Sequence, residues 1–327
     1  MSSEPNPSSP GLGDLVPGDW FIDPVASTVL VVGYAVMRVP ADRPGVLRAF
    51  DLPSVRALLG TIDFPYFDTS TVRFEVDTAN LVRVEGHVEP RRTPLAPHLI
   101  LLTPLRVDGV DGNEAEARSR VEAAAGLLAA FLGRNAVYRL VFENVTQVAP
   151  GASGQTVTGF SRAVENPLSF PAPPLDDATI DLIKQAGKSL AAVDPVRRER
   201  YVLALRWFHQ ALYGGGVDSF LRYWIAIEAV SPMTDGDIAP LVRALADGYG
   251  IAVGDFKEQY GIGRIYGLRN RIVHQGSRRP VHHQLLDYLG ALFVELLRIG
   301  LRLPVARSLD ALLSSPEFDL NSYISSP

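Results

Sequence analysis

The chain has 327 residues, of which 47% are hydrophobic and 20% are charged, a composition typical of folded globular proteins. This length favours two domains over a single hydrophobic core. The absence of cysteine excludes disulfides, thiolate metal sites and a thiol nucleophile. A formal net charge of −5 excludes a chain that is basic throughout, the pattern expected of a protein covered in nucleic-acid contacts.

The N-terminal residues 1–20 are rich in Ser, Pro and Gly and lack the basic and apolar regions of a signal peptide. We therefore predict a flexible tail here. The longest apolar run, near 25–37, is shorter than the ~20 residues that a membrane span needs, and a buried strand explains it. We expect a cytoplasmic protein that does not contact the membrane.

Residues 21–165 mix strand and helix signals, which indicates an α+β domain. Alternating polar and apolar residues predict a hairpin, and an Ala- and Leu-rich run with early acidic residues predicts a helix. No known motif indicates a role for this domain. The expected strands are 28–37, 70–77, 80–88, 98–105, 136–148 and 155–160, and the expected helix is 113–132.

Four prolines between 167 and 174 cannot lie inside a helix or a central strand. We place a linker at 166–175, an all-α bundle at 176–303 and a C-terminal tail at 304–327. Capping residues divide the bundle into helices. The predicted helix starts are Asp176 or Asp177, Pro195 behind the cap Asp194, the cap Asp218, Asp237, Ile265 and Pro280. The predicted ends of all but the Asp237 helix are Ala192, Tyr213, Ser231, Gln275 and Leu303.

The segment 220–230 is apolar almost all round, as expected of a helix in the middle of a bundle. Glu228 lies inside it and should not be buried unpaired. A salt bridge to an arginine such as Arg269 or Arg222 is the favoured interpretation. The sharper alternative is that Glu228 positions Arg269 for function.

The helix predicted at 265–275 contains Arg269, Asn270 and, four residues after Asn270, His274. Four Arg–His pairs in the chain have a spacing of this kind, so the spacing alone says little. The pairs that end at His98 and His283 are interrupted by proline. Only Arg269 and His274 lie on an uninterrupted helical pattern.

This helix resembles the motif helix of the HEPN superfamily, whose pattern is Arg-X4–6-His and in which Asn often follows the Arg. The segments 201–213 and 223–230 are similar to the central helices of the Apea-like HEPN branch. The resemblance covers about residues 195–300. It implies a metal-independent endoribonuclease that works as a homodimer, with RNA held in a cleft between two motif helices and no cofactor or metal. It also makes a toxin or phage-defence effector, with a possible regulatory partner, an expectation.

Each residue of the motif has a role compatible with that chemistry. His274 would move protons near neutral pH, and Arg269 would hold the phosphate with its planar guanidinium. Asn270 would orient the imidazole or bind the phosphate. The alternatives are that His274 bonds carbonyls at a helix end, that Arg269 is a structural ion-pair partner, and that Asn270 bonds across helices.

Basic residues cluster around the motif, although the chain as a whole is acidic. The stretch 264–307 holds eight arginines against Asp287 and Glu295, and such a local basic face would attract RNA. Solvation of helix surfaces is the alternative, as is a non-catalytic bundle that binds RNA, a nucleotide or a partner protein. The candidate RNA-binding residues are Arg264, Arg271, Arg278 and Arg279.

Adjacent histidines also invite a metal-site hypothesis. His282 and His283 follow Pro280, but neighbouring residues on a helix point apart. We therefore predict no metal site there. His209 and the aromatic residues Trp207, Tyr223 and Trp224 are expected to pack between helices.

Overall fold

The computed structural model describes residues 16–17, 27–35, 48–60, 65–67, 73–76, 82–85, 90–92, 98–105, 112–133, 139–148, 155–161, 176–232, 236–275 and 281–325. The chain forms two compact units: a sheet unit (Met1–Ala124 and Leu132–Ile180) and a helical unit (Ala125–Phe131 and Asp181–Pro327). The predicted α+β composition is confirmed. The predicted linker 166–175 lies outside the described residues, as does all of the predicted N-terminal tail except residues 16–17.

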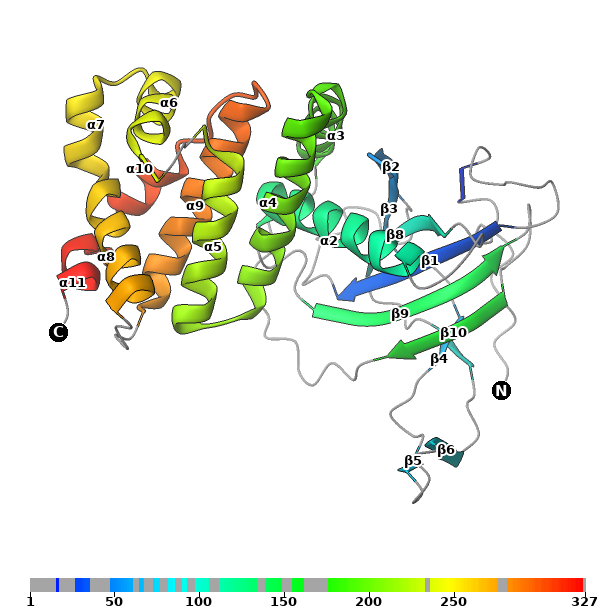
Figure 1. Ribbon diagram of the computed structural model, residues 1–327. Helices are drawn as coiled ribbons and strands as arrows, with labels where there is room; N and C mark the ends of the chain where they lie inside the picture. Colours follow the sequence, from blue (N-terminus) through cyan, green and yellow to red (C-terminus); the bar gives the residue numbers. More distant parts are fainter. Residues whose placement is uncertain are drawn as a thin grey trace. The chain divides into compact units, whose positions relative to one another are not determined.

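An antiparallel sheet of six strands, in the order β10-β9-β1-β8-β3-β2, forms the sheet unit's core (Figure 1). Two small antiparallel pairs, β4 with β7 and β5 with β6, accompany it. The strands are β1 (Ser27–Ala35), β2 (Arg48–Leu52), β3 (Val55–Gly60), β4 (Pro65–Phe67), β5 (Arg73–Val76), β6 (Val82–Glu85), β7 (Pro90–Arg92), β8 (His98–Leu105), β9 (Arg139–Val148) and β10 (Gln155–Ser161).

Strand β8 is buried on both faces, because consecutive residues of a strand point to opposite sides and Leu99 to Leu102 are all within 1% of full burial. Both its partners, β1 and β3, are apolar as well. The helix α2 (Gly112–Leu132) is tied to β9 by an ion pair between Arg118 and Glu143. Burial nevertheless raises the pKa of Glu143, against the opposing effect of that cation.

The sequence predictions for this unit are confirmed for the hairpin, the helix and the long strands. Strand β8 has the predicted bounds, and β5 pairs with β6 as expected. Four strands were not predicted: β2, β3, β4 and β7. Two of them, β4 and β7, have only three residues each, too few for an alternating pattern to emerge.

From residue 176 on, the described residues are mainly helical (Figure 1). Asp176 and Asp194 accept hydrogen bonds from the backbone N–H groups of Thr179 and Arg197, which confirms the two predicted N-terminal caps. The helices are α3 (Asp177–Ala192), α4 (Pro195–Tyr213), α5 (Gly216–Val230), α6 (Ala239–Tyr249), α7 (Val253–Tyr260), α8 (Ile262–Gln275), α9 (His283–Gly300), α10 (Ser308–Leu313) and α11 (Leu320–Ser325).

The predicted starts of α5 and α9 are wrong. Helix α5 begins at Gly216 behind Gly215, so Asp218 lies in its first turn and pairs with Arg222 instead of capping. Helix α9 begins at His283, where the side chain of His282 accepts from the N–H of Gln284 and acts as the cap. Helix α9 also ends at Gly300, before the predicted Leu303.

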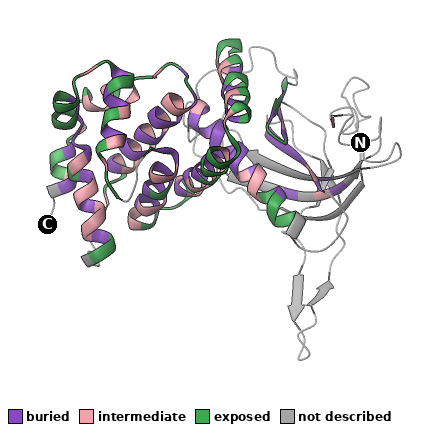
Figure 2. Cartoon of the chain, turned by 45° about the horizontal axis from the view of Figure 1, so that its top comes forward, coloured by how far each residue is buried: buried purple, intermediate pink, exposed green. Residues whose placement is uncertain are grey.

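Large side chains from three helices form the centre of the helical unit. The rings of Phe208 and Phe293 stack with centroids 4.3 Å apart, and Tyr223 meets Phe208 edge-on. Burial is concentrated on the inward faces of the helices (Figure 2). The prediction that Tyr223 and Trp224 belong to the core is confirmed, whereas Trp207 is only half-buried.

The segment 304–327, expected to be a tail, contains the helices α10 and α11. The fully buried carboxylate of Glu295 on α9 holds this segment. It accepts hydrogen bonds from the N–H of Ala306 and from both the N–H and the hydroxyl of Ser308, at 3.1, 2.7 and 2.6 Å. A buried acid in an apolar helix thus determines how the chain continues beyond α9.

His209 of α4 makes folding sensitive to acid. It is buried, as predicted, and burial lowers its pKa to about 4, below the ordinary value of 6.5. Below pH 6.5 the unfolded chain binds a proton that the folded chain does not, so stability falls as the pH drops from 6.5 towards 4. We expect this group to remove about 1.5 kcal/mol of unfolding free energy between pH 6.5 and 5.

Urea unfolding at several pH values measures this effect. In a His209→Gln variant, the fall in unfolding free energy between pH 6.5 and 5 should be smaller than in wild type by the contribution of His209. This difference should hold whatever the stability of the variant at neutral pH. The same slope in both proteins would contradict the assignment to His209.

Candidate functional site

The predicted motif lies on α8. Ile265, Leu268 and Ile272 are buried on one side of this helix. His274 is exposed on the opposite side, and Arg269 is half-buried between the two. The helix was predicted to start at Ile265 but begins one turn earlier, at Ile262.

Helical geometry separates the three motif residues into two directions. Asn270 and His274 are four residues apart and therefore share a face. Arg269 and His274 are five residues apart, which turns them about 140° from each other around the helix axis. Within one chain, Arg269 and His274 therefore do not converge on one point.

Arg269 is held in place by Glu228 of α5. One guanidinium nitrogen, Nη2, lies 3.1 Å from Oε1 of Glu228. The other, Nη1, donates to Oδ1 of Asn270 at 3.2 Å. The salt bridge expected for Glu228 is thus present and joins it to Arg269; the other candidate, Arg222, pairs with Asp218 at 3.0 Å.

Trp224 completes this arrangement and was not predicted to take part in it. Its indole N–H donates to the same Oε1 of Glu228 at 2.7 Å, and its ring is almost fully buried. Tyr266 packs against that ring and donates to the carbonyl of Gly236 at 2.7 Å. The four-residue spacing of Trp224 and Glu228 on one helix is the sequence signal that would have revealed the contact.

The imidazole of His274 is open to solvent and has no hydrogen-bond partner among the residues that the structure describes. The alternative in which it bonds carbonyls at the end of its helix is therefore not seen within the described residues. An exposed imidazole can meet a substrate without any rearrangement of the bundle.

An apolar surface adjoins the Glu228–Arg269 pair. Helices α5 and α8 run in opposite directions (Figure 1), so Ile225, three residues before Glu228, and Val273, four residues after Arg269, lie on the same side of the pair. Ile225 is 38% exposed and Val273 is 46% exposed. Two apolar side chains beside the ion pair are therefore partly open to solvent.

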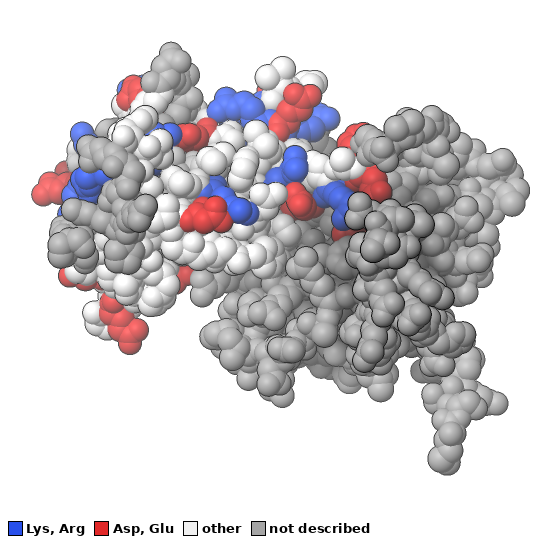
Figure 3. Space-filling view, turned by 60° about the horizontal axis from the view of Figure 1, so that its bottom comes forward, with Lys and Arg blue, Asp and Glu red and all other residues white. Residues whose placement is uncertain are grey.

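The candidate RNA-binding arginines are dispersed. Arg264 donates to Asn321 of α11. Arg271 is half-buried, and its Nε has no hydrogen-bond partner in the described part of the chain. Arg278 and Arg279 lie outside the described residues. Acidic and basic side chains alternate over the view of the surface in Figure 3, which shows no continuous basic area.

The two adjacent histidines lie closer together than the sequence suggested. Because His282 is the cap and not a helical residue, its ring is 4.4 Å from that of His283, centroid to centroid, and it stacks on Tyr323. The expectation that the rings point apart is therefore wrong. Within the described residues, no three His, Asp or Glu side chains gather as metal ligands would, and none of the helices there could cross a bilayer.

Comparisons of the chain with models of protein families, with curated proteins and with solved structures give no match. The assignment of the site therefore depends on the residues of α5 and α8 and on their geometry.

Proposed function

We propose that the chain is a metal-independent endoribonuclease of the HEPN type, with Arg269, Asn270 and His274 at its catalytic centre. The observation that carries this proposal is the contrast along α8: the guanidinium of Arg269 is fixed by Glu228 and Asn270, while the imidazole of His274 is free to meet a substrate. A fixed cation and an accessible acid or base are the two groups that RNA cleavage through the 2′-hydroxyl requires.

In the proposed reaction, the 2′-oxygen attacks the adjacent phosphorus and the 5′-oxygen of the next nucleotide leaves. His274 takes the proton from the 2′-hydroxyl or gives one to the departing oxygen. Arg269 stabilises the negative charge on the phosphate. The products are a 2′,3′-cyclic phosphate and a free 5′-hydroxyl.

We propose that a homodimer brings Arg269 and His274 together at one phosphate, which a single chain does not do. Because Arg269 and His274 diverge on α8, a phosphate that touches both would take them from two copies of the chain that face each other. The exposed side chains of Ile225 and Val273 beside Arg269 provide an apolar surface for that contact. We further propose that such an enzyme acts in the cytoplasm as a toxin or phage-defence effector, restrained by a regulatory partner.

The test is incubation of the purified protein with total RNA, followed by mapping of the new ends. We expect 5′-hydroxyl and 2′,3′-cyclic phosphate ends that are absent in a His274→Ala control. Intact RNA over the whole neutral pH range would refute the nuclease.

A second candidate function is a non-catalytic bundle that binds RNA, a nucleotide or a partner protein. The divergence of Arg269 and His274 within one chain favours it, as does the alternation of charges on the surface in Figure 3. Binding of RNA that persists without any cleavage product would support this alternative.

A further inference from the structure

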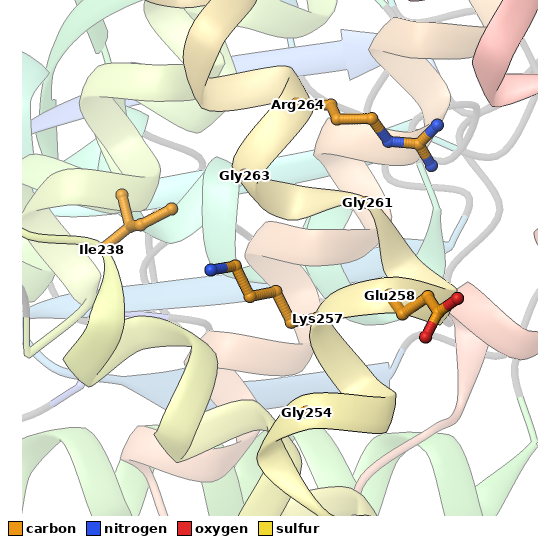
Figure 4. Close-up of a pocket in the computed structure, with 7 residues that line it drawn as sticks. All are labelled: Ile238, Gly254, Lys257, Glu258, Gly261, Gly263 and Arg264. Carbon is orange, nitrogen blue, oxygen red and sulfur yellow. The ribbon is translucent and has the colours of Figure 1, made fainter.

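A hollow of about 770 Å³ lies between α7 and the start of α8 (Figure 4). Glycines form much of its wall: Gly254, Gly261 and Gly263. A Cβ added to Gly254 would meet nothing within 4 Å. A Cβ added to Gly263 would have the Cε of Lys257 as its nearest neighbour, at 3.8 Å. The hollow therefore leaves backbone accessible and has room for a group of the size of a phosphate.

Lys257 is the cation of this hollow. Its amino group extends across the hollow towards Ile238, whereas the side chains of Glu258 and Arg264 point the other way (Figure 4). Arg264 is engaged by Asn321. Among the described residues, Lys257 has no ion-pair partner, so its charge is available to an anion.

The hollow opens onto the face of α8 that carries the motif. Gly263, Gly267, Asn270 and His274 are spaced by four, three and four residues, which places all of them on one side of the helix. Beside Gly267 lies the guanidinium of Arg271, whose Nη1 is 4.0 Å from the position of an added Cβ. The backbone of this face is therefore uncovered at Gly263 and Gly267, and the guanidinium of Arg271 lies beside Gly267.

The hollow is lined by Lys257 and Arg264 and also by the acidic Glu258, and helix α7 carries a second acidic residue, Asp255. Helix α8 contains three arginines and no acidic residue. Of these, Arg269 pairs with Glu228, whereas neither Arg271 nor Lys257 of α7 has an acidic partner within the described residues. Because these cations come from two helices, a flexible strand with one negative charge per nucleotide could contact more of them than a compact ligand could.

We propose that the hollow binds a backbone phosphate of single-stranded RNA that lies along this face of α8, with Lys257 as the principal contact. The proposal rests on the proposed function for its ligand class. Gly263 and His274 are eleven residues apart, so the hollow is about 16 Å from His274 along the helix. That span corresponds to about five stacked nucleotides at the rise of ~3.4 Å per nucleotide in one strand, or to fewer in an extended strand.

Binding of 2′-O-methyl RNA tests this subsite, because RNA without a free 2′-hydroxyl cannot be cleaved by the proposed reaction. The probes are fluorescent strands of about 2 and about 12 nucleotides, of which only the longer can span the hollow and His274 together. In the full-length protein, Lys257→Gln should weaken binding of the longer strand about fivefold and lower the salt slope by about 0.7, the value for one phosphate contact. Binding of the shorter strand should change less than twofold.

The control is Lys184→Gln, which removes an exposed lysine from α3 and should leave the binding of both strands unchanged. Gly263→Glu places a carboxylate in the hollow and should reproduce the effect of Lys257→Gln. Equal binding of the longer strand by wild type and Lys257→Gln would overturn the proposal, as would equal affinity of wild type for the two lengths. A protein that shows the Lys257 effect but cleaves no RNA would retain this subsite while the nuclease proposal failed.

Discussion

Replacing Arg269 with alanine is expected to lower the rate of RNA cleavage at least a hundredfold while leaving the bundle folded. The guanidinium is the group proposed to stabilise charge on the phosphate, and removal of one such donor typically costs a factor of about 10² to 10³. The side chains of Arg269 and Glu228 are 22% and 34% exposed. Because water screens such a pair, its loss should cost only about 1 kcal/mol of unfolding free energy.

Two comparisons separate a role in cleavage from a role in folding. Arg269→Lys keeps the charge but loses the planar fork, so its cleavage rate should lie between those of wild type and Arg269→Ala. Arg222→Ala removes a similarly placed arginine that pairs with Asp218 on the same helix, and cleavage should be unchanged. Single-turnover cleavage rates and melting temperatures should be measured for wild type, Arg269→Ala, Arg269→Lys and Arg222→Ala. Wild-type rates in Arg269→Ala would make the residue a structural ion-pair partner only.

Replacing Glu295 with alanine is expected to destabilise the helical unit by about 3 to 4 kcal/mol. The carboxylate is fully buried and accepts three hydrogen bonds from Ala306 and Ser308. Without it, two backbone N–H groups and a hydroxyl lose their acceptor at about 1–3 kcal/mol for each group that stays buried, and a cavity remains. The segment with α10 and α11 should loosen first.

Urea unfolding and hydrogen exchange of the segment 304–325 measure this prediction. Glu199→Ala is the matched control, because Glu199 is exposed on α4 and its removal should change stability by less than about 0.5 kcal/mol. Glu295→Gln keeps the shape and one acceptor oxygen, so it should be destabilised less than Glu295→Ala. If Glu295→Ala and Glu199→Ala unfold alike, the buried carboxylate does not hold this segment.

The starts of α3 and α4 could be predicted because their signals are local. A capping aspartate followed by helix-forming residues, or by proline at the first position, determines a start whatever surrounds it. The same reasoning failed at Asp218, because Gly216 adopts a positive φ of 57° and the helix begins three residues earlier, with Gly215 as its N-cap. Pro280 was misjudged because His282, which seldom caps helices, provides the cap for α9.

Tertiary contacts determine the elements that the sequence did not reveal. Helix α7 has eight residues and helices α10 and α11 have six each, too few for a periodic pattern to show. Their positions depend on distant groups: Tyr260 donates to Asp310, and Glu295 holds the chain at Ser308. Such pairs are separated by up to 50 residues in the sequence, and no local pattern specifies them.

At the candidate site, the sequence predicted that Glu228 pairs with an arginine, Arg269 or Arg222, but neither which of the two nor how the motif is oriented. A charge in an apolar helix requires a partner, and the structure shows that this partner is Arg269. The contribution of Trp224 and the hollow beside Lys257 could not be predicted, since both depend on how α5, α7 and α8 are packed.

The central claim is that His274 performs acid–base chemistry on RNA, and cleavage of one end-labelled RNA in excess chelator tests it most directly. His274 is exposed on α8, so its replacement with alanine should leave the unfolding transition unchanged. We predict steady cleavage by wild type and a rate lower by a factor of about 10² or more for His274→Ala. Equal rates for the two proteins would contradict the account.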